Sequence, residues 1–473
     1  MAVATKQLTS VNPATEEVIE HFEVMSGDAV SEVIERAALA YRTWRTTPIA
    51  ERVAVVRALG ARLRARRDDL AAHASREMGK PIIEAEAEVD KCAAACDHVA
   101  GHAEADLAEI PAPSDSPNSL VSFEPLGPVL AVMPWNFPYW QVIRFLAPAL
   151  AAGNVGVLKH AANVTRCALE LERCVAEAGG PPGLLGVLLI TGEQTTPVIE
   201  DPRIVAVTLT GSDTTGARVA AAAGGVLKKT VLELGGSDAF IVLEDADLER
   251  AVEMAVLSRY QNTGQSCIAA KRFIVVEAVA ADFEDRLVDR VRALRTGDPF
   301  DRDTQVGPLA REDLRTSAER QIGESVEHGA RLVCGGGRPR PRGWYLAPAV
   351  LVGCEPGMPV MREETFAPVA AVTRVSGEAE AVEVANASVY GLGGNVWTAD
   401  VARGRALARR LETGGVFING MTHSDPRIPF GGIKRSGYGR ELGSFGIREF
   451  VNVQTVWLPA DAVRHGGPAA AVE

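Results

Sequence analysis

The amino-acid sequence predicts an α/β protein of two or three domains. Its 473 residues exceed the length of one ordinary domain. Short apolar runs alternate with helical stretches over residues 136–234, and the alternation restarts after residue 238 with different loop lengths. Repeated β-α-β units with buried apolar strands favour parallel sheets that helices cover on both faces. We therefore expect two successive α/β domains.

The first hundred residues favour helices. Helical patterns cover residues 28–44, 51–78 and 81–105. Ser26 can cap the first of these helices, and Pro81 suits the first turn of the third. A Pro- and Ser-rich loop follows and ends this helical part.

The next segment is predicted to form a parallel sheet, because four apolar runs typical of strands are separated by helical stretches. The predicted strands are 155–158, 185–190, 204–209 and 229–232, and the predicted helices are 139–152, 164–178, 193–199 and 213–222.

Three further strand-like runs lie outside this alternation. They cover residues 120–124, 129–133 and 449–458. An early hairpin and a terminal strand could pair with each other and with a second subunit. We therefore expect residues 116–133 and 448–460 to form an arm for homo-oligomerisation.

Composition narrows the partners and the compartment. The chain is 47% hydrophobic and 23% charged, which is typical of a soluble globular protein. Its net charge of -12 argues against nucleic acid or an anionic membrane as a partner. It has no apolar run of about 18 residues and no apolar N-terminal signal. Seven cysteines, an odd number without tight pairing, favour the reducing cytoplasm.

Four potential metal ligands lie close together in the sequence, but their spacing does not favour a metal site. Cys92, Cys96, His98 and His102 lie close together on one predicted helix. On a helix with 3.6 residues per turn, His98 points away from Cys96, so one helix cannot gather all four ligands. We expect ordinary packing and no metal site.

Cys267 is the strongest candidate for a nucleophile. Most cysteines of cytosolic proteins behave as inert small hydrophobes. Only Cys267 ends a polar, Gly-containing loop, residues 261–267, between a predicted helix and a predicted strand. Backbone amides in such a loop could stabilise a thiolate, and two regular elements would hold it in place.

Glu233 is a candidate general base. It ends a very apolar run, and partial burial would raise the pKa of its carboxyl group and suit it to proton abstraction. The alternative is a buried glutamate that neighbouring backbone amides satisfy in the following glycine turn.

Two features at predicted strand ends fit a nucleotide. Residues 211–216 follow a strand and open a helix, so their N–H groups could face a phosphate, although they also make a plain helix-capping turn. Lys159 ends the strand 155–158, where it could donate to a ribose or simply be solvated. Neither feature is specific alone.

Five segments, in this order and spacing, resemble the aldehyde dehydrogenase superfamily over almost the whole chain. They are residues 134–138, 211–216, 233–236, 264–267 and 364–368. The resemblance implies a Rossmann-like cofactor-binding domain (residues 1–115 and 134–234), an α/β catalytic domain (residues 235–430) and the β arm for oligomerisation. The implied assembly is a homodimer or a dimer of dimers.

The resemblance also implies a catalytic set. The Cys267 thiolate attacks an aldehyde, the Asn136 amide and the Cys267 N–H hold the oxyanion, and Glu233 activates water to hydrolyse the thioester. Hydride passes to a nicotinamide. Lys159 would hold the adenosine ribose, Ser212 a phosphate, and Glu364 the nicotinamide ribose. The implied cofactor-binding residues are Trp135, Lys159, Ala162, Gly211, Ser212, Glu364 and Phe366.

One departure from the family pattern concerns the cofactor. Members specific for NAD usually carry a glutamate three residues after the lysine, and Ala162 stands at that position here. Removal of this carboxylate favours NADP as the preferred cofactor, with NAD also possible.

The substrate is predicted from a second set of residues. Arg144 lies two helical turns after Asn136, on a helical face that includes Trp140, and Ser266 and Ser424 lie in motif loops. This set resembles that of bacterial succinate-semialdehyde dehydrogenases, which bind a distal carboxylate, so the implied substrate is succinate semialdehyde.

Four alternatives stay open at this stage. Arg144 could form a structural ion pair, or the enzyme could accept aliphatic or aromatic aldehydes broadly. A CoA-acylating enzyme is disfavoured because Glu233 is present to activate water. A cofactor-independent cysteine hydrolase would need a histidine base, and the motif segments contain none.

Overall fold

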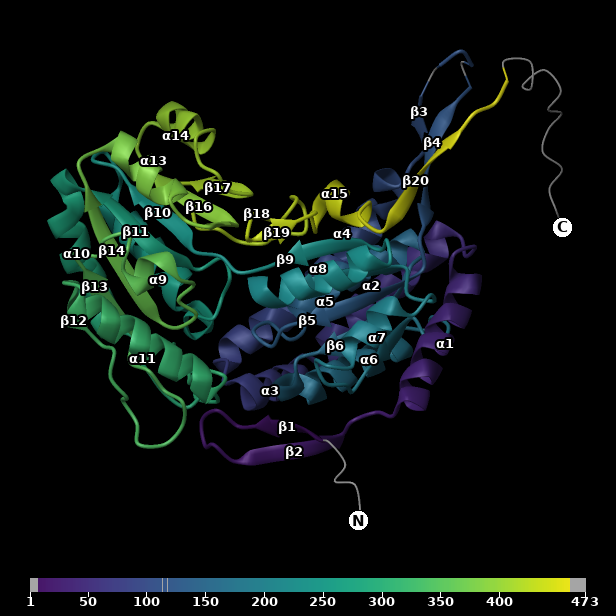
Figure 1. Cartoon of the computed structure of the whole chain (residues 1–473), viewed down its shortest axis with the longest axis horizontal. Helices are drawn as coiled ribbons and strands as arrows, with labels where there is room; N and C mark the ends of the chain where they lie inside the picture. The colour runs from purple at the N-terminus through teal and green to yellow at the C-terminus, as the bar shows by residue number, and fades with distance from the viewer. Residues whose placement is uncertain (1–6, 113, 117, 460–473) are drawn as a thin grey trace.

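The computed structural model describes residues 7–112, 114–116 and 118–459, and it has two α/β units side by side (Figure 1). The first unit contains a six-stranded sheet in the order β19-β9-β8-β5-β6-β7. Its strands are β5 (Pro128–Met133), β6 (Val155–His160), β7 (Leu185–Val187), β8 (Ala206–Thr210), β9 (Lys229–Glu233) and β19 (Gly437–Tyr438). All pairs are parallel except β19 with β9. The predicted parallel sheet is confirmed.

Helices cover this sheet and include every helix predicted for the first half of the chain. They are α1 (Gly27–Trp44), α2 (Ile49–Ala65), α3 (Arg67–Met78), α4 (Ile82–Asp106), α5 (Trp140–Ala152), α6 (Thr165–Glu177), α7 (Thr195–Glu200) and α8 (Asp213–Gly225). One predicted helix is divided at Arg66, where the backbone turns out of the helical region. Ser26 caps α1 as expected, with its side chain accepting from the Ala29 N–H.

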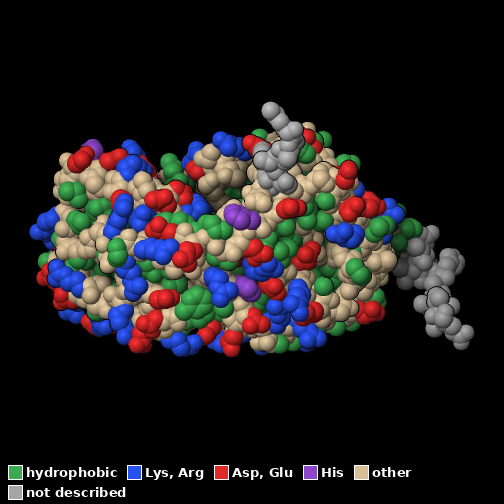
Figure 2. Space-filling view, turned by 90° about the horizontal axis from the view of Figure 1, so that it is seen from below, with side chains coloured by type: hydrophobic (Ala, Val, Ile, Leu, Met, Phe, Trp, Pro, Cys, Tyr) green, Lys and Arg blue, Asp and Glu red, His purple; other side chains and the backbone are tan. Residues whose placement is uncertain are grey.

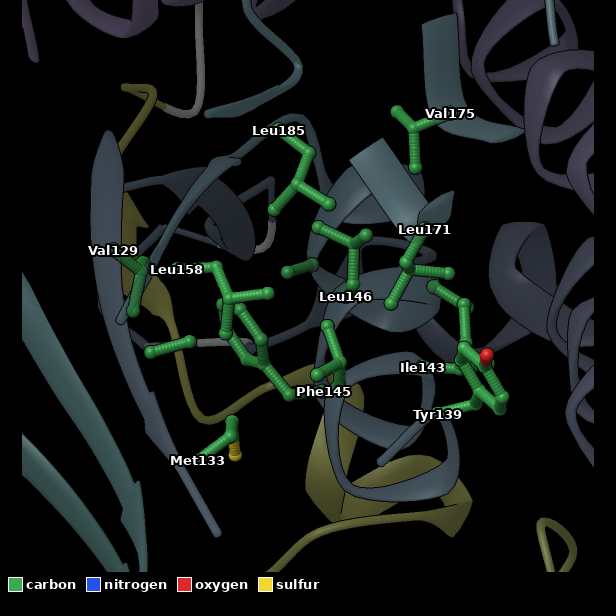
Figure 3. Packing of buried hydrophobic residues seen from close by; sticks show 14 of the residues in the cluster. Val129, Met133, Tyr139, Ile143, Phe145, Leu146, Leu158, Leu171, Val175 and Leu185 are labelled. Atoms are coloured by element: carbon green, nitrogen blue, oxygen red, sulfur yellow. The ribbon is translucent and has the colours of Figure 1, made fainter. Parts of the chain in front are cut away.

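Helix α5 is the centre of the first unit, and all of its residues are buried. Phe145 and Leu146 of α5 lie among side chains from β5, β6 and α6 (Figure 3). Burial of each such side chain stabilises the fold by roughly 1.5–3 kcal/mol. A helix packed on all sides has one permitted position, so the polar side chains it carries are held rigidly.

The second unit contains a seven-stranded sheet in the order β12-β13-β14-β11-β10-β16-β17. Only β12 is antiparallel to its neighbour. The strands are β10 (Asp238–Val242), β11 (Ala270–Val276), β12 (Arg331–Cys334), β13 (Ala349–Val352), β14 (Val369–Val375), β16 (Gly393–Trp397) and β17 (Gly415–Ile418). The helices are α9 (Leu248–Tyr260), α10 (Glu277–Arg292), α11 (Glu312–Glu327), α12 (Pro359–Arg362), α13 (Glu378–Asn386) and α14 (Val401–Ala408).

A three-stranded arm extends from the first unit at the upper right of Figure 1. It consists of β3 (Ile110–Pro111), β4 (Leu120–Pro125) and β20 (Val451–Val456). We expected residues 116–133 to belong to the arm, and this was wrong for the last part of that range. Strand β5 pairs with β6 and β8 in the six-stranded sheet instead. The apolar run 129–133 is buried there on both sides, whereas an arm strand has an exposed face.

Several short elements escaped prediction. The N-terminal hairpin β1 (Gln7–Val11) and β2 (Val18–Glu23) packs below the first unit in Figure 1. The C-terminal part returns across both units through β18 (Ile433–Lys434), which pairs with β15 (Tyr390–Gly391), and through α15 (Gly443–Ile447).

The topology predicts where ligands bind. The chain runs from β5 through β6 to β7 on one side and then crosses to β8 and β9 on the other. Ligands of open α/β sheets bind at the carboxyl ends of the strands beside such a reversal. Residues that follow β5, β8 and β9 face the second unit from this edge.

None of the helices in the described parts of the chain is long and apolar enough to cross a membrane. On the face in Figure 2, Lys and Arg side chains are interspersed with Asp and Glu, so that face offers no single-sign patch for a polyanion.

Candidate active site

Two clefts share the side chains of Cys267 and Gln141 in their walls. The first has a volume of about 670 Å³ and is called the cofactor cleft below. It is lined by the predicted residues Trp135, Asn136, Gly211, Ser212, Glu364 and Phe366. The second, of about 940 Å³, is the substrate cleft, and it is lined by the predicted residues Trp140, Arg144, Ser266 and Ser424. The thiol is therefore accessible from both clefts.

The loop that carries Cys267 has a strained backbone held by buried side chains. Asn262 and Thr263 have φ values of 52° and 56°, which residues other than glycine adopt rarely. Gly264 follows with φ 72°, and a Cβ atom there would lie 2.4 Å from the Ala367 carbonyl oxygen. The buried Arg259 guanidinium donates to the carbonyl oxygens of Gly264 and Ala367, so it ties this loop to the loop that carries Glu364.

Asn136 is joined directly to the nucleophile loop. Its side-chain Nδ2 donates to the backbone carbonyl oxygen of Gln265 at 3.1 Å. The backbone carbonyl oxygen of Asn136 accepts from Asn262 Nδ2 at 2.8 Å. Asn136 is buried and follows β5. An amide nitrogen carries two hydrogens, so one remains to face an oxyanion at the thiol.

The Cys267 thiol is protonated in the resting enzyme. Burial raises its pKa to about 12, although the positive charges of Arg144 and Lys271 act in the opposite direction. Lys271 Nζ donates to the carbonyl oxygens of Ser266 and Cys267 at 2.9 and 2.7 Å. The sequence argument that backbone amides favour a thiolate is not sufficient here, because desolvation of the charged form outweighs them.

Glu233 ends β9 and is almost fully buried. Burial raises the pKa of its carboxyl group well above the usual range, with Arg144 opposing and Glu441 reinforcing the shift. Neither carboxyl oxygen has a hydrogen-bond partner among the described residues, so the alternative of satisfaction by backbone amides is not observed. A Cβ atom at Gly431 would lie 2.8 Å from Glu233 Oε1, so a glycine leaves room for the carboxyl group.

The cofactor cleft has an aromatic wall and a carboxylate. Trp135 and Phe366 meet edge to face with centroids 5.7 Å apart. Glu364 accepts from the Gly236 N–H at 2.9 Å and lies 3.8 Å from Lys271 Nζ. The predicted positions of Phe366 and Glu364 therefore bring an apolar surface and an oxygen acceptor close to the thiol.

The remaining predicted cofactor residues lie at strand and helix ends. Ser212 caps α8, with its hydroxyl oxygen accepting from the Thr215 N–H at 3.3 Å, as the capping alternative expects. Lys159 lies in β6 and Ala162 begins the short helix η1 (Ala162–Val164). Burial lowers the pKa of Lys159, and no described residue pairs with its ammonium group.

The four predicted substrate residues lie together in the substrate cleft, but Arg144, Trp140 and Ser424 have side-chain partners in the protein. Arg144 forms an ion pair with Glu441 and donates to Thr210 Oγ1 at 3.0 Å. Ser424 Oγ accepts from Trp140 Nε1 at 2.9 Å. The predicted contact between Arg144 and a substrate carboxylate stays a prediction, and the structural ion pair that we kept as its alternative is present.

A model of the aldehyde dehydrogenase family matches residues 2–456. This chain belongs to the aldehyde dehydrogenase family. Its curated relatives include "Succinate-semialdehyde dehydrogenase [NADP(+)] 1" of Mycobacterium tuberculosis, which is 48% identical over 95% of this chain and 99% of the relative. "Succinate semialdehyde dehydrogenase [NAD(P)+] Sad" of Escherichia coli is 47% identical over 95% and 97%.

Solved structures agree with this assignment. The succinic semialdehyde dehydrogenase of Streptococcus pyogenes, solved with NADP+ as the cofactor, has a TM-score of 0.93 and 40% identity. The similarity covers 96% of this aldehyde dehydrogenase and 100% of that chain. The predicted family and fold are thus confirmed.

Three side chains of this aldehyde dehydrogenase site escaped the sequence analysis. Glu441 and Lys271 approach the catalytic residues, and Lys91 of α4 lines the substrate cleft. Each lies outside the motifs, and only the folded chain brings it near Cys267. Lys91 lies on a helix that the sequence predicts, but the sequence alone does not show that its side chain points into the substrate cleft.

The four potential metal ligands of α4 pack in two separate places and not around a common centre. Cys92 and Cys96 are buried in the core, while His98 and His102 stack with their rings 4.1 Å apart. Within the described segments of this aldehyde dehydrogenase, no group of three or more His, Cys, Asp or Glu side chains is arranged to hold a metal ion.

Proposed function

We propose that this aldehyde dehydrogenase oxidises succinate semialdehyde to succinate and prefers NADP over NAD. One observation carries the proposal: a cleft with cationic side chains and a cleft with cofactor motifs meet at Cys267. A substrate with a carboxylate at one end and an aldehyde at the other fits the first cleft. Relatives named for this reaction, at 47% and 48% identity, support the assignment.

Cys267 begins the proposed mechanism. Its Sγ passes its proton to a solvent water molecule and attacks the carbonyl carbon. The carbonyl π bond breaks as the C–S bond forms, and the oxygen becomes an oxyanion that Asn136 Nδ2 stabilises. A nicotinamide dinucleotide held by Ser212 and Glu364 in the cofactor cleft would supply the two-electron oxidation that turns this adduct into a thioester. Lys271, through its bonds to the Ser266 and Cys267 carbonyl oxygens, keeps the thiol in position throughout.

Glu233 acts in the second half-reaction. Its carboxylate removes a proton from water, the water oxygen attacks the thioester carbon, and the C–S bond breaks to release the acid and restore Cys267. A carboxyl group with a raised pKa is a strong base once it is ionised. Arg144 lowers the pKa of Glu233, so it helps to maintain the ionised form.

The residues of the cofactor cleft fit a dinucleotide phosphate. Ser212 lies at the N-terminus of α8, where free N–H groups and the helix dipole favour an anion. Lys159 lies near the end of β6, outside the lining of this cleft, and its ammonium group has no partner among the described residues. Glu364, Trp135 and Phe366 line the end of the cleft near Cys267 and would hold the nicotinamide nucleoside.

Initial rates with a small panel of aldehydes test the proposal. Succinate semialdehyde should give the highest kcat/KM among succinate semialdehyde, butanal and benzaldehyde, and NADP should exceed NAD. Equal kcat/KM for all three would favour the broad-specificity alternative instead. Ester hydrolysis without aldehyde oxidation would favour the cysteine hydrolase.

Ala162→Glu should shift the preference from NADP toward NAD. A glutamate at this position would face the 2′-phosphate. At an effective dielectric constant near 20, two unit charges about 4 Å apart repel by roughly 4 kcal/mol. We expect the ratio of kcat/KM for NADP to that for NAD to fall by at least about tenfold, which corresponds to roughly 1.4 kcal/mol.

Ala162→Gln is the matched control, because glutamine has nearly the same shape as glutamate but no charge. This variant should keep most of the NADP preference. An unmodified enzyme that favours NAD by tenfold would contradict the proposed preference, whatever the variants do.

We also propose a cytoplasmic homo-oligomer. The cysteines at all seven positions are free, as expected in a reducing compartment. In the arm, β20 exposes Val453 and the adjacent Trp457, an apolar edge that a second subunit would cover. Sedimentation velocity should give the mass of a dimer or a dimer of dimers, and a monomer would contradict this part.

A further inference from the structure

Lys91 brings a positive charge into the substrate cleft. It lies on α4, and its Nζ donates to Ser424 Oγ at 2.8 Å and lies 4.1 Å from the centroid of the Trp140 ring. Lys91 lines the same cleft as Cys267. It forms no ion pair with any carboxylate in the described part of the chain. An ammonium group this deep in a cleft, without a counterion, would attract an anionic ligand.

Arg144 is the other cation of the substrate cleft, and unlike Lys91 it has a counterion in the protein. Its guanidinium is paired with the buried Glu441 carboxyl group and also donates to Thr210. One face of the guanidinium also packs on the Phe430 ring, with its Cζ atom 5.2 Å from the ring centroid. Its charge is therefore largely compensated, whereas that of Lys91 is not.

Ser424 is arranged to donate to an acceptor-only ligand. Its hydroxyl oxygen accepts from both Lys91 Nζ and Trp140 Nε1, and these bonds use both of its lone pairs. The hydroxyl hydrogen is then left to donate. A carboxylate only accepts hydrogen bonds, so it complements this hydroxyl together with the remaining ammonium hydrogens of Lys91.

We propose that Lys91 and Ser424 bind the distal carboxylate of the substrate, and that Lys91 determines the preference for acidic over neutral aldehydes. The inference rests on the proposed function, since it requires an ω-carboxylate aldehyde in this cleft. The residue that contributes most to binding of the substrate carboxylate then lies outside the sequence motifs. Arg144 instead holds Glu441 beside the catalytic Glu233.

Lys91→Met tests this assignment. Methionine keeps an apolar stem over the Trp140 ring but removes the charge. The ratio of kcat/KM for succinate semialdehyde to that for butanal should fall by roughly 10- to 100-fold, as is typical for loss of a charged hydrogen bond. The loss should appear mainly as a higher KM for the acidic substrate. Lys91→Arg should recover a large part of the ratio.

Two comparisons isolate the role of the charge. Lys229→Met removes one positive charge from a half-exposed side chain that pairs with Glu449, and it should leave the ratio unchanged. Arg144→Met should slow both aldehydes together, because Glu441 would lose its counterion next to Glu233. A ratio that falls in Arg144→Met but stays within twofold in Lys91→Met would overturn the proposal in favour of Arg144.

A binding measurement without turnover provides a second readout. Butyrate should slow the alkylation of Cys267 by iodoacetamide in the unmodified enzyme more strongly than the uncharged butyramide does. Lys91→Met should lose this difference, and a difference that persists would overturn the proposal. An unmodified enzyme without preference for succinate semialdehyde would instead refute the proposed function, so the two failures are distinguishable.

The unmodified enzyme offers a test that no folding defect can obscure. Burial lowers the pKa of Lys91 to about 8, and Arg144 acts in the same direction against Cys92, Glu88 and Asp425. The substrate carboxylate is ionised throughout this range, so the specificity ratio should fall about tenfold from about pH 7 to about pH 9.5 as Lys91 loses its proton.

Other titrating groups do not change this expectation. Glu84, also in the wall of the cleft, has a pKa raised to about 7 by burial, and His423 is exposed at its mouth. Ionisation of Glu84 would lower the ratio mainly below about pH 8, so the fall between about pH 8 and about pH 9.5 is the part that reports on Lys91. Cys267 and Glu233 act on every aldehyde, so their ionisation cancels in the ratio. A ratio that stays constant above pH 8 would contradict the role of Lys91.

Discussion

Replacement of Cys267 by alanine is expected to abolish aldehyde oxidation. Among the described residues, the thiol is the only nucleophile that lines both clefts, so the variant can form neither the covalent adduct nor the thioester. Loss of the nucleophile of an acyl-transfer enzyme typically lowers kcat by about 10⁴-fold or more. The measurement is the appearance of reduced cofactor at its absorbance maximum with succinate semialdehyde and NADP.

Cys334→Ala is the matched control for this loss. Cys334 is also partly buried, and burial likewise raises the pKa of its thiol, but it lies in β12 at the edge of the second sheet. This variant should keep full activity. Cys267→Ala should still bind NADP, as measured by quenching of tryptophan fluorescence. A Cys267→Ala enzyme with near wild-type turnover would exclude the thioester mechanism.

Much of this site could be predicted because its residues follow strands. Asn136 follows β5, Ser212 follows β8 and Glu233 ends β9, and the carboxyl ends of parallel strands meet at one edge of a sheet. Periodicity located these strands, and the resemblance to the aldehyde dehydrogenase family implied the roles of Asn136 and Ser212. The local sequence was therefore sufficient for the parts of the site that a single sheet edge collects.

The parts contributed by packing could not be predicted. Lys91 and Ser424 are 333 positions apart in the sequence, and only the docking of α4 against the loop after β17 brings them together. Arg144 lines the substrate cleft, and its pairing with Glu441 depends on the return of the C-terminal segment to the first unit. Neither contact leaves a pattern in local sequence.

The assignment of β5 to the arm was wrong for a related reason. A short apolar run is compatible both with a buried parallel strand and with one strand of a hairpin, and its sequence does not distinguish the two. Leu126, Gly127 and Pro128 look like a turn between β4 and β5, and a two-strand arm was the simplest interpretation. The long-range pairing of β5 with β6 and β8 decides the outcome.

Glu233→Gln is expected to permit one burst of reduced cofactor and then to stall at the thioester. Glutamine fills the same buried space but cannot accept a proton from water. Steady-state turnover should fall by about 10²- to 10⁴-fold, the usual contribution of a general base. Rapid mixing should show a burst of about one equivalent per active site. Mass spectrometry should find the succinyl group on Cys267.

Glu172→Gln is the matched control for this variant. Glu172 also has a carboxyl pKa raised by burial, and it accepts from the Val187 N–H through Oε1, a bond that an amide oxygen retains. It should turn over like the unmodified enzyme. Glu233→Gln with near wild-type turnover would show that another group activates water.

The pH dependence separates loss of a base from a simple packing defect. Since burial raises the pKa of Glu233, its carboxyl group is protonated at low pH and becomes an active base only as the pH rises through that pKa. Deacylation in the unmodified enzyme should therefore accelerate with increasing pH. In Glu233→Gln this rise should be absent, because the residue no longer ionises, and the residual rate should follow hydroxide concentration alone. A packing defect would lower the rate at every pH but keep the shape of the wild-type profile.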